Sequence, residues 1–115
     1  MDLKNKIISA PDLKEQQVSI PEWGGDYFLR EFSALDRMSF RAEVEAFGDS
    51  AQEVKNLRFA CLSITKSLVD MDGNQILDAS DVDALMGKSL EVINRVSAAV
   101  LKLNGIGEHE VIEGE

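Results

Sequence analysis

The stretch from Ile20 to Asp26 constrains the fold most, because it forces the chain to reverse direction. Its sequence is Ile-Pro-Glu-Trp-Gly-Gly-Asp, and it holds the only tryptophan and one of the 2 prolines. Pro21 fixes φ at about −65° and lacks the N–H that a strand ladder needs, whereas Gly24 and Gly25 reach positive φ without a Cβ clash. Apolar and polar residues alternate on both sides of this turn. The pattern predicts a β-hairpin over about residues 16–32.

The apolar residues of the hairpin leave two interpretations open. Tyr27 and Phe28 are neighbours, so in a strand they point to opposite faces. We expect one face to pack on helices and the other to await a partner. Trp23 is either a lid over the apolar face of the hairpin or an exposed anchor for a partner.

After the hairpin the apolar residues recur with a helical period. Ser33 and Asp36 resemble a capping box, and Gly48 is a natural C-cap, so these residues bound a first helix. Helical spacing predicts that this helix faces the core with Leu35, Met38, Ala42 and Ala46, with Phe40, Val44 and Phe47 close to the same stripe.

A second helix follows the capping box of residues 50–53 and is expected to be the most buried element. Its predicted core stripe is Val54, Leu57, Cys61, Ile64 and Leu68. Phe59 and Leu62 widen that stripe and could form a second partner surface. Beyond it, Ser80 caps a short helix, Gly87 marks a break, and Asn104 with Gly105 ends a longer helix.

These elements predict a mainly α fold with a small N-terminal β-hairpin, an α+β chain in which about four helices pack as a compact bundle. At 115 residues the chain is one domain. We divide it into an N-terminal arm (residues 1–15), a hairpin plus helical domain (16–105) and a flexible acidic tail (106–115). Because Pro11 pushes the preceding residue out of the helical region, the arm is expected to be extended or a single short strand.

Composition narrows the classes of partner. The chain has 21 acidic and 12 basic side chains, a net charge of −9, and its basic residues are scattered. We therefore expect no nucleic acid partner and no membrane partner. The single cysteine excludes an internal disulfide and is consistent with a reducing compartment. No apolar run approaches the roughly 20 residues of a membrane span, and the N-terminus lacks the features of a secretory signal.

An acidic segment that begins at Asp70 resembles the loop of a calcium-binding EF-hand. The oxygen-bearing residues at ligand positions would be Asp70, Asp72, Asn74, Asp78 and Asp81. Two departures count against calcium: Gln75 occupies the position that needs glycine, and Asp81 occupies the position that needs the longer glutamate. We expect no metal, and the alternative to a calcium loop is a polar loop that leads into a capped helix.

No pattern in the sequence predicts catalysis or a cofactor. Cys61 lies on an apolar helical stripe, which is typical of a buried and inert thiol. His109 is the only histidine and lies in the predicted tail, far from Cys61 in the sequence. The glycine pairs lack the strand, loop and helix context of a phosphate-binding loop. The chain is therefore expected to be a protein with binding partners and no enzymatic activity.

Several stretches resemble the small tail assembly chaperones of long-tailed (siphophage-type) bacteriophages and prophages. They are residues 7–13, 18–25, 29–33, 36–37, 70–73, 80–82 with Leu85, and 88–89 through 103–104, within a resemblance that runs from Lys4 to Asn104. The turn Pro21, Glu22, Trp23, Gly24 and Gly25 is its most specific part.

The resemblance implies a non-catalytic protein of the host bacterial cytoplasm that is absent from the mature virion. Proteins of this family bind the tape measure protein, keep its apolar helices soluble and help recruit tail tube protein. A frameshifted longer form often shares the same N-terminal domain, and would be a further partner.

Exposure arguments suggest Trp23, Tyr27, Phe28, Phe59 and Leu62 as partner-binding residues. A possible homo-oligomer is also expected, since a long client could gather several copies. Two other functions stay open at this point: a calcium-responsive EF-hand-like helical binding module, and a small bacterial adaptor protein.

Overall fold

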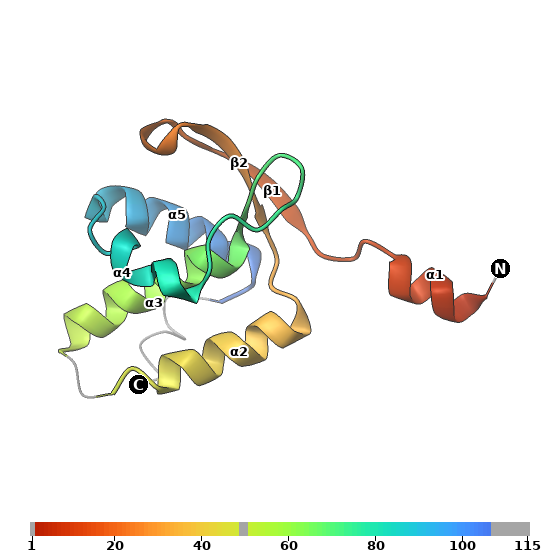
Figure 1. The fold of residues 1–115 in the computed structure, drawn as a ribbon, viewed down its shortest axis with the longest axis horizontal. Coiled ribbons are helices and arrows are strands. Elements are labelled where there is room, and N and C mark those ends of the chain that lie inside the picture. The colour runs from red at the N-terminus through yellow and green to blue at the C-terminus, as the bar shows by residue number, and fades with distance from the viewer. Residues whose placement is uncertain (1, 49–50, 107–115) are drawn as a thin grey trace.

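The computed structural model describes residues 2–48 and 51–106, and Figure 1 shows how they are arranged. The elements in chain order are α1 (Leu3–Ser9), β1 (Glu15–Ile20), a 3₁₀ turn η1 (Pro21–Trp23), β2 (Gly25–Arg30), α2 (Ala34–Glu45), α3 (Gln52–Ser67), β3 (Leu68–Val69), a 3₁₀ turn η2 (Ala79–Asp81), α4 (Val82–Leu85) and α5 (Leu90–Leu103). The predicted α+β fold with an N-terminal hairpin is confirmed. The helices that contribute buried residues are α2 to α5, while α1 stands apart.

The hairpin forms as the turn chemistry predicts. Strands β1 and β2 are antiparallel, and Ile20 pairs with Gly25 next to the turn. Gly24 has φ +101° and Gly25 has φ +140°, the left-handed region in which a side chain would be strained. The sequence did not predict β3, whose two residues pair with β2 and make a three-stranded sheet in the order β1-β2-β3.

The core lies between α3, α5 and the inner face of the hairpin. Cys61 and Ile64 of α3 are fully buried, and α3 contributes more buried residues than any other described element. Ile20 and Leu29 close the core from the sheet, while Ile93 closes it from α5. The prediction that α3 is the most buried element is therefore confirmed, although Val54 in its first turn is exposed.

The predicted core stripe of α2 is wrong. Leu35 and Met38 are 75% and 64% exposed, whereas Phe40 is only 4% exposed. The ring of Phe40 lies between Phe32, at 5.3 Å between centroids, and Phe59, at 4.9 Å. Aromatic rings bury more area than Leu or Met, so the helix turns its aromatic side inward and leaves the other apolar stripe in solvent.

The structure corrects the expectations for the arm and for the start of the tail. Residues of the arm form α1, which begins where the Asp2 carboxylate accepts a hydrogen bond from the Lys4 N–H (3.0 Å), so the expectation of an extended arm or strand is wrong for residues 3–9. At the C-terminal side, Ile106 is buried in the core and cannot belong to a flexible tail. The rest of the predicted tail, including His109, lies outside the described residues.

Local capping signals place some of the helix ends, although α2 ends at Glu45, before Gly48, and Asp78 caps η2 in place of the predicted Ser80. Ser33 and Asp36 form the reciprocal capping box of α2. Gly87 lies between α4 and α5, and Gly105 ends α5 with φ +69°. Helix α3 begins after Ala51, and the predicted cap at Ser50 lies outside the described residues.

Candidate interaction surface

The hairpin tip is tied to α5 by an ion pair and is closed on itself by a second hydrogen bond. The Glu22 carboxylate accepts from both terminal guanidinium nitrogens of Arg95, at 2.6 and 3.2 Å. The Tyr27 hydroxyl donates to the Trp23 carbonyl across the turn. Donation from Arg95 lowers the pKa of Glu22, so its carboxylate stays charged at neutral pH. The turn that carries the family resemblance is thus held in one position over α5 (Figure 1).

The three aromatic residues of the hairpin lie on two faces of the sheet. Trp23 and Tyr27 pack against the core and are half-buried, so Trp23 acts as a lid while part of its ring stays accessible. Phe28 points to the opposite face, because side chains alternate along a strand, and it is also half-buried. On that outer face Arg30 donates to the Gly73 carbonyl (3.2 Å), which brings the acidic loop alongside.

The structure does not leave Phe59 and Leu62 open as a partner surface. Leu62 is 2% exposed, and Phe59 is half-buried in the aromatic stack with Phe40. Helix α2 covers this flank of α3, and a salt bridge between Lys66 and Glu43 (3.0 Å) holds the two helices together. The exposure expected for Leu62 is therefore wrong, because the wide apolar stripe of α3 is needed to pack α2.

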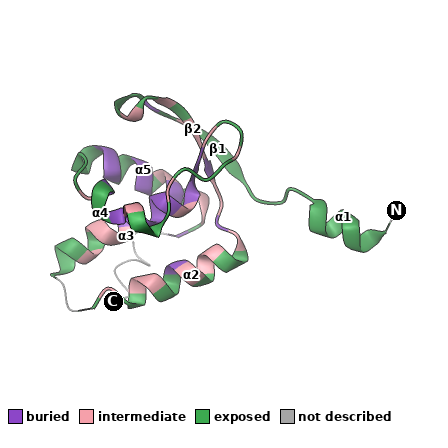
Figure 2. Cartoon of the chain, viewed as in Figure 1, coloured by how far each residue is buried: buried purple, intermediate pink, exposed green. Residues whose placement is uncertain are grey.

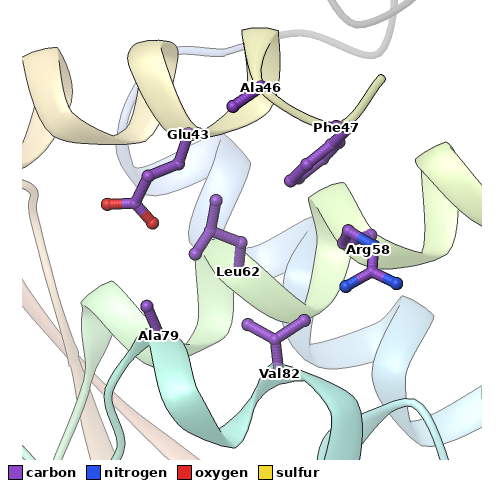
Figure 3. Close-up of a pocket in the computed structure, with 7 residues that line it drawn as sticks. All are labelled: Glu43, Ala46, Phe47, Arg58, Leu62, Ala79 and Val82. Carbon is purple, nitrogen blue, oxygen red and sulfur yellow. The ribbon is translucent and has the colours of Figure 1, made fainter. Parts of the chain in front are cut away.

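A shallow hollow of about 240 Å³ marks the seam between α2, α3 and η2 (Figure 3). Its lining residues are Glu43, Ala46, Phe47, Arg58, Leu62, Ala79 and Val82. Arg58 lies over the Phe47 ring at 5.9 Å and pairs with Asp83 at 3.1 Å. The hollow is smaller than the pockets of about 300–1,000 Å³ that hold small molecules. Arg58, the one cationic residue in its lining, is already paired with Asp83. It is a packing seam between helices.

The acidic loop uses its carboxylates to hold its own backbone. The Asp70 carboxylate accepts from the N–H groups of Asn74 and Asp72, both at 2.9 Å, and these bonds, that from Asn74 most of all, lower its pKa. The Asp78 carboxylate accepts from the Ser80 N–H at 2.8 Å. Asp81 completes a capping box by accepting from the Asp78 N–H at 2.9 Å. The five predicted ligand residues therefore belong to two separate turns. Within the described part of the chain, no group of three acidic, histidine or cysteine side chains is placed to hold a metal ion.

Cys61 is buried in α3 and carries no hydrogen-bonded base among the described residues. Burial raises the pKa of its thiol to about 11. A thiol with that pKa is protonated at neutral pH and is a poor nucleophile. Its role is to pack in the core.

Two apolar surfaces that the sequence analysis did not identify are exposed. The first, which we call the arm face, comprises Leu3, Ile7 and Ile8 of α1, at 72%, 72% and 78% exposure. The second, which we call the α2 stripe, comprises Leu35, Met38, Ala42 and Ala46. Figure 2 shows α1 exposed throughout and α2 as a mixture of exposed, intermediate and buried residues. The signal for the α2 stripe was present in the sequence, since α2 carries apolar residues on two faces and only one face can meet the core.

The fold and these surfaces define a class of protein, a small acidic α+β domain with apolar side chains exposed on its surface. In the described residues no helix is long and apolar enough to cross a membrane. Residues 3–113 match the family model described as phage tail assembly chaperone, so the chain belongs to that family.

A solved structure, that of the bacteriophage HK97 tail assembly chaperone, has the same fold. It aligns with a TM-score of 0.67 and 21% sequence identity, over 90% of this chain and 98% of the HK97 chain. No curated protein sequence matches the chain.

Proposed function

We propose that the protein binds the tape measure protein during phage tail assembly and keeps its apolar helices from aggregating. The observation that carries this proposal is the combination of family membership with exposed apolar surface on a body of net charge −9. A chaperone for a long apolar helix needs apolar surface to contact the client and charge to keep the complex dissolved.

The hairpin is the client-binding region in this proposal. Trp23, Tyr27 and Phe28 are all half-buried, and Phe28 lies on the outer face of the sheet. Aromatic side chains supply large contact area for little loss of conformational freedom, which suits an anchor. The bond between Glu22 and Arg95 orients this region before the client arrives.

The wider role follows the family resemblance. The protein would help recruit tail tube subunits to the client, share its N-terminal domain with a frameshifted longer form, act in the host bacterial cytoplasm and leave before the virion matures. It would need no cofactor and catalyse no reaction.

Affinity purification of the tagged chain from a phage-producing host tests this function. We expect the tape measure protein to co-purify, and we expect less of it with Phe28→Ser. Leu90→Ser is the matched control, because Leu90 is an exposed apolar residue at the start of α5 and is not part of the hairpin. Normal phage yield without recovery of the tape measure protein would contradict the proposal, as would equal recovery with Phe28→Ser at an unchanged circular dichroism spectrum.

A further inference from the structure

We propose that residues 107–115 of the chain pack across the α2 stripe of the same molecule. Leu35 and Met38, the largest residues of this stripe, are 75% and 64% exposed, and nothing within residues 2–48 and 51–106 covers them. An exposed apolar surface of this kind is a site of contact. The segment that follows Ile106 has the position, the length and the charge to make that contact.

The described chain ends beside the beginning of α2. The Arg37 guanidinium donates to the Asn104 carbonyl at 3.1 Å, and the Asn104 side-chain carbonyl accepts from the Phe32 N–H at 2.8 Å. Ile106, two residues further on, is buried in the core. These contacts fix the start of the following segment close to the first turns of the helix that carries the stripe.

The length of the segment suits the stripe. Helix α2 has 12 residues and is about 18 Å long. Residues 107–115 follow Ile106, and an extended chain of that length spans about 30 Å. Val111 and Ile112 are the apolar pair in the segment, within about 20 Å of chain from Ile106. They can therefore reach Leu35 and Met38 of their own molecule.

Charge favours the same contact. Residues 107–115 hold four glutamates and no lysine or arginine. Arg37 and Arg41 lie four residues apart on α2, on one flank of the stripe. Arg41 is exposed and forms no salt bridge with any residue in 2–48 or 51–106. Glu108 and Glu110 precede the apolar pair, so they meet these two cations as the segment reaches the stripe.

The acidic residues of α2 limit where the segment lies. Glu43 is paired with Lys66 at 3.0 Å, whereas Glu45, in the last turn, is exposed. An acidic segment is repelled by an exposed carboxylate, so we place the contact on the first two turns of α2, at Leu35 and Met38.

The contact joins two parts of one chain, so the packed fraction does not depend on protein concentration. This separates it from any association between copies. The ion pairs are at the surface, so salt should weaken the contact. The proposal replaces the flexible tail that the sequence predicts for these residues, and it does not depend on client binding.

Nuclear magnetic resonance of the full chain with labelled methionine methyl groups tests the contact. Met38 and Met71 are both exposed, at 64% and 54%, and only Met38 lies on the stripe. We expect Val111→Ser/Ile112→Ser to shift the Met38 methyl resonance and to leave that of Met71 unchanged. An unchanged Met38 resonance in this variant would overturn the proposal.

Cross-linking in dilute solution measures the same contact within one molecule. A bismaleimide should join the two cysteines of a Met38→Cys/Ile112→Cys chain at least about 10-fold faster than those of a Met71→Cys/Ile112→Cys chain. Cys61 is buried and should not react. Equal rates for the two chains would overturn the proposal, and so would a product that consists only of linked dimers.

The charge contribution has its own matched pair of variants. In the Met38→Cys/Ile112→Cys chain, Glu108→Gln/Glu110→Gln should slow the cross-link about threefold. Glu15→Gln/Glu53→Gln removes the same charge from exposed sites on β1 and α3 and should leave the rate unchanged. An equal effect of both pairs would contradict the pairing with Arg37 and Arg41. No client is present in these measurements, so their failure leaves the proposed client binding unaffected.

Discussion

Helices α3 and α1 carry similar apolar side chains and have opposite environments. Ile64 of α3 is fully buried, whereas Ile7 of α1 is 72% exposed. Helix α3 packs against α5, α2, α4 and the sheet, and all of its residues from Ala60 to Thr65 are buried. Helix α1 is joined to β1 by residues 10–14, and none of its residues is buried.

The difference shows that an apolar stripe predicts contact but does not say with what. Helix α3 stabilises this chain, since burial of its side chains removes apolar area from water. The apolar side chains of α1 remain exposed in the monomer, so they contribute no such burial. A seven-residue helix is also too short to be stable alone, which makes its order depend on whatever it contacts.

The largest effect that would test this comparison is expected for Ile64→Ala. The substitution removes a fully buried side chain from the centre of the core, where the neighbours cannot close the cavity. We expect the free energy of unfolding to fall by about 2–5 kcal/mol. Urea denaturation followed by circular dichroism measures it, and a loss as small as that of a surface substitution would mean that α3 is not the centre of the core.

A smaller effect is expected at the N-terminal cap of α2, a helix with one buried side and one exposed side. The Ser33 hydroxyl accepts from the Asp36 N–H at 3.0 Å, and Ser33→Ala leaves that donor without its partner. We expect a loss of about 1 kcal/mol in the same denaturation experiment. Ser39→Ala, inside α2, is the control and should not destabilise the protein, because alanine is the better helix former.

The bond between Glu22 and Arg95 should give a local pH dependence at the hairpin tip. The pKa of Glu22 is lowered below its ordinary value of 4.5 in the folded chain. The stabilisation is therefore fully present above pH 4.5 and is lost as the pH falls through the lower folded-state pKa. Both side chains are solvent-accessible, so we expect little change in global stability.

Fluorescence of Trp23, the only tryptophan, reports on that tip. We expect its emission to change during acid titration of the wild-type chain before the far-UV circular dichroism changes. Glu22→Gln should show the altered emission already at neutral pH, and Glu53→Gln on α3 should titrate like wild type. Identical titrations of Glu22→Gln and wild type would show that the ion pair does not position the tip.

The smallest effect is expected for Ile7→Ala, the counterpart of Ile64→Ala in the arm. Because Ile7 has no buried contact in the monomer, we expect the free energy of unfolding at low protein concentration to change by less than about 0.5 kcal/mol. Denaturation at low and high concentration measures it. A large loss in the dilute monomer would mean that the arm packs on its own body.

The features that the sequence predicted correctly are those specified by local signals. Pro21, Gly24 and Gly25 specify the turn through their own backbone preferences, and the hairpin was predicted from them. The capping box of Ser33 and Asp36 is equally local and was also predicted. Helix α1 was not predicted, because Pro11 was read as keeping the whole arm extended, whereas it constrains only Ala10 and the helix ends before it, at Ser9.

The candidate site was less predictable because exposure is a property of the whole fold. Leu62 had the right residue type and spacing for a spare flank, and its exposure was decided by where α2 lies. Leu35 and Phe40 both satisfied the helical period, and the choice between them depended on Phe32 and Phe59 from other elements. The period of a helix defines its faces but does not say which face meets the core.

By itself, the sequence determined the α+β class, the hairpin and its tip, some helix ends and the strongly acidic charge, because these follow from backbone preferences, capping and counting. Only the tertiary structure decided which apolar residues are buried, that two turns share the acidic loop, and that the arm face and the α2 stripe stay in solvent. Burial requires a partner surface, and in this chain those surfaces come from elements distant in the sequence.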